Sequence, residues 1–123
     1  MRWLVDGMNV IGSRPDGWWR NRAGAAQRLT AALEQLADES GDEVVVVFEG
    51  EKYPALPPGP RGGVEVVYAR RHGQNAADDR IVELVAAHND PATFTVVTSD
   101  RDLVRRVTSL GARVVGPRSL PLR

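Results

Sequence analysis

Short apolar runs that alternate with amphipathic stretches constrain the fold of this chain more than any other feature of its sequence. The run from Val44 to Phe48 is continuously apolar, which is typical of a parallel strand that is covered on both faces. In the longest amphipathic stretch, Leu29, Leu33 and Leu36 recur at helical spacing. We predict strands at residues 2–7, 43–50, 64–69, 94–99 and 112–115, and helices at residues 22–40, 76–89 and 100–111. This order predicts an α/β fold with a mostly parallel, doubly wound sheet in a single domain, residues 1–123.

One connection breaks the alternation. Residues 50–63, GEKYPALPPGPRGG, link the second and third predicted strands with four prolines and no helical pattern. A structureless loop of this length in a compact domain is often functional, although a variable surface loop is an equal alternative. We expect this segment to lack regular structure, to be mobile in the free protein and to adjoin the residues that follow the second strand.

Composition narrows the class of protein. The chain has no cysteine, which excludes disulfides and thiolate metal sites. No apolar run is long enough for a signal peptide or a membrane span, so we expect a cytoplasmic protein with no membrane partner. The formal net charge is zero, yet Lys52 is the only lysine among 16 basic residues, so the other 15 are arginines. Arginine suits bidentate contact with phosphate, although a GC-rich genome would also produce this bias.

Acidic and amide side chains follow four of the predicted strands or open the next helix. They are Asp6 and Asn9 after the first strand, Glu49 after the second, Asp78 and Asp79 after the third, and Asp100 and Asp102 after the fourth. In a doubly wound sheet, ligands bind outside the carboxyl ends of the strands. We therefore expect these side chains to gather at one edge of the sheet.

Each acidic position also has a purely structural interpretation. Ser99 with Asp102, and Asn75 with Asp78, have the spacing of a capping box at a helix start. Several carboxylates at one edge, however, repel one another unless protons or a cation intervene. An oxygen-only ligand set favours a hard cation such as Mg²⁺ or Mn²⁺. The residues alone leave both interpretations open.

Other site chemistries lack their motifs. The sequence contains no G-x-x-x-x-G-K, no G-x-G-x-x-G and no G-x-S-x-G, which argues against a nucleotide cradle or an α/β-hydrolase nucleophile. His72 and His88 do not have the spacing of zinc ligands. A receiver-like phosphoacceptor domain needs a lysine near its acids, and Lys52 in the proline-rich segment is a poor candidate.

Three segments together resemble a known family. LVDGMNVIG, NAADDRIVELV and VVTSDRDLVRRV are similar to motifs of the NYN domain, a branch of the PIN-like nuclease superfamily, and most of all to its YacP-like group. The resemblance covers essentially the whole chain in the right order. It implies a flavodoxin-like, three-layer α/β/α sandwich and metal-dependent endoribonuclease chemistry.

The resemblance also implies roles for individual residues. The catalytic set carried over is Asp6, Asn9, Asp78, Asp100 and Asp102, and all of these except Asn9 are expected to bind Mg²⁺ or Mn²⁺. Asp79, Glu49 and Ser99 are expected to support the metal indirectly. Glu49 departs from the family pattern, because aspartate is more usual in the corresponding FDG.

Arginines near these motifs are the predicted RNA contacts. They are Arg14, Arg20, Arg22, Arg70, Arg71 and Arg101. The first three surround Trp18 and Trp19, whose rings would either stack on unpaired bases or cover the first long helix as core.

The predicted function is hydrolysis of RNA phosphodiester bonds by metal-activated water at the acidic cluster. The alternative is a non-catalytic RNA-binding or adaptor module that keeps the PIN-like fold. The expected partner is single-stranded RNA. The ribosome or a larger RNA-processing complex as a further partner, and a monomer or a weak homodimer as the oligomeric state, are left open.

Overall fold

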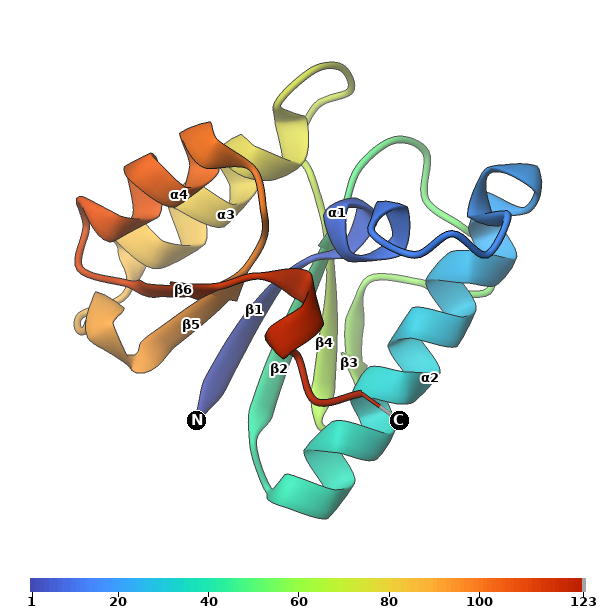
Figure 1. Cartoon of the computed structure of the whole chain (residues 1–123), viewed down its shortest axis with the longest axis horizontal. Helices are drawn as coiled ribbons and strands as arrows, with labels where there is room; N and C mark the ends of the chain where they lie inside the picture. Colours follow the sequence, from blue (N-terminus) through green and yellow to red (C-terminus); the bar gives the residue numbers. More distant parts are fainter. Residues whose placement is uncertain (123) are drawn as a thin grey trace.

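The computed structural model describes residues 1–122 and contains one six-stranded sheet (Figure 1). The strands are β1 (Arg2–Asp6), β2 (Glu43–Phe48), β3 (Gly59–Arg61), β4 (Val64–Tyr68), β5 (Phe94–Val97) and β6 (Arg113–Val115). Their spatial order is β3-β4-β2-β1-β5-β6, and every neighbouring pair is parallel except β3 with β4.

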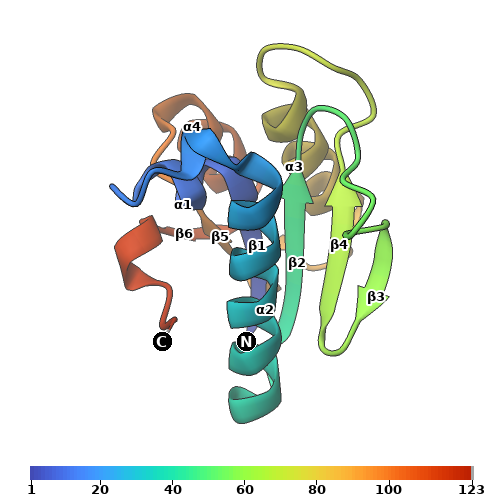
Figure 2. The same ribbon diagram turned by 90° about the vertical axis from the view of Figure 1, so that its right-hand side faces the viewer.

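Helices cover both faces of this sheet. The α-helices are α1 (Gly7–Gly12), α2 (Arg22–Ser40), α3 (Ala76–Ala87) and α4 (Arg101–Thr108), and the short 3₁₀ helices are η1 (Trp18–Arg20), η2 (Pro91–Thr93) and η3 (Pro117–Ser119). Figures 1 and 2 show α2 on one face and the pair α3 and α4 on the other. The predicted three-layer α/β/α sandwich, of the PIN-like and flavodoxin-like kind, is confirmed. No helix among residues 1–122 has the length and apolar character to cross a bilayer.

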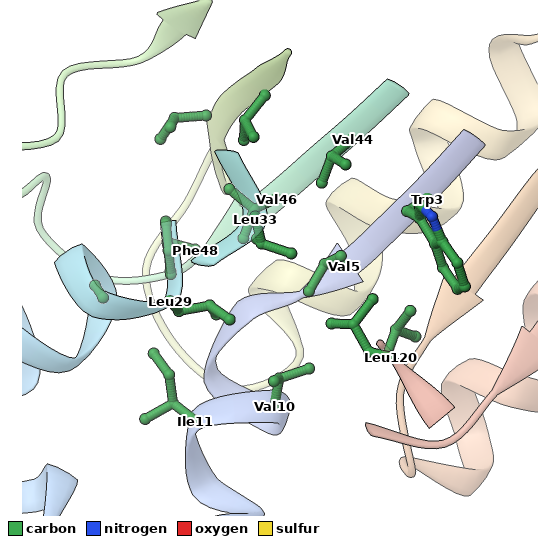
Figure 3. Close-up of a cluster of buried hydrophobic side chains, with 14 of the residues drawn as sticks. Trp3, Val5, Val10, Ile11, Leu29, Leu33, Val44, Val46, Phe48 and Leu120 are labelled. Atoms are coloured by element: carbon green, nitrogen blue, oxygen red, sulfur yellow. The ribbon is translucent and has the colours of Figure 1, made fainter. Parts of the chain in front are cut away.

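The continuous apolar run in β2 has side chains on both faces, as the sequence predicted. Val44, Val46 and Phe48 belong to the core under α2, together with Leu33 of that helix (Figure 3). Val47 points the other way, into the core that α3 and α4 cover. Burying each such side chain contributes about 1.5–3 kcal/mol to the stability of the fold, so packing on both faces keeps the sheet between its helices.

Strand order reverses at β1, which places a topological switch point at the centre of the sheet. β2 and β4 lie on one side of β1, whereas β5 and β6 lie on the other. Ligands of such folds bind outside the carboxyl ends of the strands at this point. The residues that follow β1 and β5 therefore define where a site is expected.

The proline-rich segment is anchored to the rest of the fold. Residues 50–58 form neither helix nor strand, as expected, and the expectation fails only for Gly59–Arg61. Leu56 is only 1% exposed and packs into the core under α2. The hydroxyl of Tyr68 donates to the carbonyl of Leu56 (2.9 Å) and accepts the backbone N–H of Tyr53 (3.1 Å). The segment then forms β3, the antiparallel edge strand. It thus lies on the face of the sheet where a right-handed crossover helix would lie.

Element boundaries differ by a few residues from the predicted ones, and helix α1 and the three short 3₁₀ helices were not predicted. The chain turns directly into α1 after Asp6 instead of forming an open turn. Helix α3 ends at Ala87, with His88 at its C-cap, and α4 begins at Arg101, with Asp100 as its N-cap.

Candidate active site

The structure brings four of the predicted acids to one cavity at the carboxyl edge of the sheet. The cavity has a volume of about 270 Å³ and is lined by Asp6, Met8, Asn9, Glu49, Asn75, Ala77, Asp78 and Asp100. These residues come from the ends of β1 and β2 and from the starts of α1, α3 and α4. The cavity therefore lies at the switch point that the strand order defines.

Asp6 is the last residue of β1 and is only 4% exposed. Burial is the main cause that raises the pKa of its carboxyl to about 7, and the negative charges of Asp78 and Glu49 contribute to this rise. Hydrogen bonds from the Thr98 hydroxyl (2.9 Å, to Oδ2) and the Asn9 backbone oppose this rise without cancelling it. Asp6 thus keeps a proton near neutral pH when no cation is nearby.

Asp78 lies in the first turn of α3 and is also buried, at 7% exposure. Its pKa is raised to about 6, first by burial and then by the charges of Asp100 and Glu49. The guanidinium of Arg106 partly opposes this rise. Two carboxyls with raised pKa values therefore face one cavity, a pattern that clusters at functional sites.

Asp100 is both a helix cap and a lining residue of the cavity. Its Oδ1 accepts the backbone N–H of Leu103 at 3.0 Å, which caps α4. The predicted capping box of Ser99 and Asp102 is wrong, because the backbone N–H and hydroxyl of Ser99 instead donate to Oδ1 of Asn9, at 2.9 and 3.0 Å. The predicted box at Asn75 is wrong too, since its side chain makes no capping bond and the residue lines the cavity at φ 62°.

The same contacts orient Asn9. Because both donors of Ser99 need an acceptor, they fix the carbonyl oxygen of the Asn9 amide. Within residues 1–122, Nδ2 of Asn9 has no hydrogen-bond partner. Asn9 therefore offers a donor to a ligand in the cavity that it lines.

Gly7 allows the sharp passage from β1 into α1. A Cβ atom at this position would lie 2.6 Å from Cε1 of Phe48 and 2.9 Å from the carbonyl oxygen of Val47. The glycine in the DGMN motif is thus required by the close approach of β2, and simple turn chemistry does not explain it. Its absence of a side chain keeps Asp6 and Asn9 beside the cavity.

Three residues predicted at the site lie outside the cavity in this conformation. Asp102 is exposed and forms an ion pair with Arg105 one turn further along α4, although its charge still adds to the rise in the pKa of Asp78. Asp79 bridges Arg71 (2.7 Å) and Arg106 (3.0 Å). The third is Ser99, which contacts Asn9 instead.

None of the predicted RNA-contacting arginines lines the cavity. Arg71 pairs with Asp79, the residue after the lining residue Asp78, and Arg101 directly follows the lining residue Asp100. Arg70 is paired with Glu83 at 2.9 Å. The other three, Arg14, Arg20 and Arg22, lie beyond α1 in the sequence.

Sequence reasoning underrated two residues of the site. The positive charge of Arg106 lowers the pKa of Asp78. The sequence gave no signal of this role, because the spacing of Arg106 also fits a solvent-exposed helix face. Asn75 lines the cavity, and its only signal was a polar residue before a helix.

The donor set fits a hard divalent cation, because it consists of carboxylate and amide oxygens with two acids that resist ionisation. In the present side-chain positions, no three His, Cys, Asp or Glu residues among residues 1–122 lie close enough together to hold a metal ion. Side-chain rotation toward the centre of the cavity would be needed for the acids to share one.

This fold is that of a PIN-like domain, with the acidic cavity at the carboxyl edge of its sheet. Residues 3–122 match the family described as the YacP-like NYN domain. The chain belongs to this family, which is a PIN-like nuclease family, and the resemblance that the three motifs indicated is confirmed.

Solved structures and a curated relative agree with this assignment. Crystal structures of Rae1 (YacP) from Bacillus subtilis, one of them of a W164L mutant, superpose with a TM-score of 0.78 at 28% and 29% identity, over 98% of this chain and 71% of theirs. The UPF0178 protein mlr0875 of Mesorhizobium japonicum is 37% identical over 93 residues, which are 76% of this chain and 54% of that protein. This chain thus spans about half the length of that curated relative.

Proposed function

We propose that this chain is a metal-dependent endoribonuclease that hydrolyses phosphodiester bonds of single-stranded RNA. The observation that carries the proposal is the grouping of Asp6, Asp78 and Asp100 around one cavity at the switch point. The raised pKa values of Asp6 and Asp78 mean that ionising both carboxyls lowers the stability of the metal-free protein. A cation that binds there removes the repulsion and supplies the positive charge that phosphate chemistry needs.

Asp6, Asp78 and Asp100 would hold Mg²⁺ or Mn²⁺. When bound, such an ion lowers the pKa of the attacking water and offsets charge on the scissile phosphate. The Thr98 hydroxyl donates to Oδ2 of Asp6 and so orients this carboxyl, which lines the cavity. The Nδ2 amide of Asn9 would donate a hydrogen bond to a phosphate oxygen.

Glu49 lines the same cavity and forms no ion pair within residues 1–122. We assign it the role of orienting the attacking water and accepting its proton as the water oxygen bonds to phosphorus and one P–O ester bond breaks. Asp102 as a direct ligand, with Asp79 and Ser99 in support, stays a prediction. A cytoplasmic location, a monomer or weak homodimer, and association with the ribosome or a larger RNA-processing complex also remain proposals.

The test is incubation of the purified protein with a circular single-stranded RNA in millimolar Mn²⁺ and in EDTA. Opening of the circle in Mn²⁺ alone is the expected result, because only internal cleavage acts on RNA without ends. Asp78→Asn should lose this activity, and Asp38→Asn, an exposed aspartate of α2 outside the cavity, should keep it. RNA binding without cleavage in Mn²⁺ would instead favour the non-catalytic RNA-binding module.

A further inference from the structure

We propose that Trp18, Trp19, Arg20 and Arg22 form a stacking surface for unpaired bases of an RNA strand that leaves the acidic cavity. We call these four residues the tryptophan platform. The inference rests on the proposed function, because it concerns how the same substrate is bound. It adds a binding surface outside the cavity, built on η1 and the first residue of α2.

The two rings of the platform have different environments. Trp18 is half-buried and packs against the core under α2, whereas Trp19 is 56% exposed. Their ring centroids lie 6.0 Å apart at an interplanar angle of 87°, an edge-to-face contact. The half-buried Trp18 ring thus supports one edge of the contact, and Trp19 presents aromatic surface to solvent.

Two arginines lie over these rings. Cζ of Arg20 is 5.8 Å from the centroid of Trp19, and Cζ of Arg22 is 5.4 Å from that of Trp18. Neither guanidinium pairs with a carboxylate in the part of the chain that the structure describes. Arg61 and Arg70, by contrast, each pair with a glutamate. The positive charge of the platform is therefore available to phosphates.

The platform and the cavity lie at the same end of the sandwich. Figures 1 and 2 both show the start of α2 and the chain before it at the end where β1 runs into α1. Trp18 packs near the end of α1, because a Cβ at Gly12 would lie 3.9 Å from its ring. Helix α1 carries Asn9, which lines the cavity. A strand crossing α1 would thus pass from the cavity to the platform.

The chemistry of the platform favours RNA over a protein partner. Trp19 is one of three large exposed apolar side chains among the described residues, and the others are Met1, which precedes β1, and Leu110, which follows α4. A single exposed ring beside unpaired arginines gives little apolar area for a protein, but it matches a base with its flanking phosphates. Stacking of this kind is tolerant of sequence.

The experiment measures binding of a fluorescently labelled single-stranded RNA oligonucleotide in EDTA, where cleavage is absent. Trp19→Ala should weaken binding about tenfold, and Trp19→Phe should keep most of the affinity. Leu110→Ala is the matched control and should bind like the wild type. RNA should also quench tryptophan fluorescence in the wild type more than in Trp19→Phe.

Salt dependence tests the arginines. Arg20→Ala should lower the slope of log affinity against log salt by about 0.7, the value for one phosphate contact on a single strand. Arg118→Ala, an exposed arginine of η3 with no ion pair within residues 1–122, should leave the slope unchanged.

Equal affinity of Trp19→Ala and wild type, or no measurable binding by the wild type, would overturn the proposal and assign Trp19 to a protein partner or to no partner. Equal loss of affinity for a double-stranded RNA of the same length would also overturn it, because paired bases do not stack on the ring. The two proposals fail separately. Weaker binding by Trp19→Ala without any Mn²⁺-dependent cleavage refutes the nuclease, whereas cleavage with unchanged binding refutes the platform.

Discussion

Acidic side chains at the two ends of β1 differ in whether positively charged partners stabilise them. At the amino end, Asp42 accepts hydrogen bonds from the terminal ammonium of Met1 (3.0 Å) and the indole of Trp3 (3.1 Å), and Glu43 pairs with Arg2 at 2.7 Å. At the carboxyl end, the three aspartates of the cavity form no salt bridge within residues 1–122. The positive charge that acts on Asp78 is that of Arg106, which also forms an ion pair with Asp79.

The pKa values record this difference. Hydrogen bonds from the terminal ammonium and Trp3 lower the pKa of Asp42, whereas burial and like charge raise those of Asp6 and Asp78. The acids at the amino end are thus stabilised as anions by the fold. The acids at the carboxyl end are retained at a cost to stability, which is expected where a site must bind something that the empty protein lacks.

The largest expected effect is on cleavage. Asp6→Asn should lower the rate of RNA hydrolysis by at least about a hundredfold, because it removes one of the charges that would hold the cation. Asp42→Asn, the matched change at the other end of the strand, should leave the rate unchanged. Equal rates for wild type and Asp6→Asn in a single-turnover assay would show that the cavity does not carry the activity.

The next effect is on stability against pH in the absence of metal. The folded protein holds a proton on Asp6 up to about pH 7, whereas the unfolded chain releases it near 3.8. The folded state binds more protons between these values, so stability should fall as pH rises from about 4 to about 7, by up to about 1.4 kcal/mol per pKa unit. Asp42 acts in the opposite sense, since its lowered pKa means that its contribution is lost as pH falls through the folded value.

Urea unfolding in EDTA at a series of pH values measures both contributions. Asp6→Asn should remove its own share of the fall between pH 4 and 7 and leave the smaller share due to Asp78, whose pKa is raised to about 6. Asp42→Asn should leave that fall in place and reduce the loss of stability in acid. A wild-type curve that rises over this interval would contradict the comparison of the two ends.

A smaller effect is expected at the turn that places the acids. Gly7→Ala should destabilise the fold by about 1–3 kcal/mol, because the new Cβ would overlap Phe48 and the backbone of Val47. Gly12→Ala at the end of the same helix is the control, since its Cβ meets nothing closer than 3.9 Å. Chemical denaturation compares the free energies of unfolding of the two variants. Equal values would mean that β2 moves away from the new Cβ at little cost.

The smallest effect is expected for Asp102→Asn. This residue is exposed and pairs only with Arg105 one turn away, so its replacement should change stability by about 0.5 kcal/mol or less. Its Mn²⁺ response in a thermal melt should equal that of the wild type. Loss of that response would instead support the role of direct ligand that the family resemblance implies for Asp102.

Much of the site followed from the sequence because a simple geometric rule placed it. Parallel strands have their carboxyl ends on one edge of the sheet, so the acidic residues that follow the strands were expected to lie close together. Asp6, Asp78 and Asp100 do line one cavity. Glu49 lies there too, although its departure from the expected aspartate had left its role open.

The remainder depended on contacts between segments distant in sequence. Asp102 follows the extended N-cap Asp100 by two residues and lies in the first turn of α4, where it pairs with Arg105 and does not line the cavity. The capping interpretation of Ser99 failed because Asn9, distant in sequence, accepts both of its hydrogen bonds. The proline-rich segment is anchored by isolated residues, among them Leu56 in the core and Tyr53 through Tyr68, which give no periodic signal.

The most direct test of the account is thermal melting at pH 8, in EDTA and in millimolar Mn²⁺, of the wild type, Asp6→Asn and Asp42→Asn. Mn²⁺ should raise the melting temperature of the wild type, since a ligand at 100 times its Kd adds about 2.7 kcal/mol. In EDTA, Asp6→Asn should melt above the wild type, because it removes a buried repelling charge, and it should lose most of the Mn²⁺ response. Asp42→Asn should melt below the wild type and keep that response. Lower stability of Asp6→Asn in EDTA with an intact Mn²⁺ response would contradict the claim that these acids form a cation site.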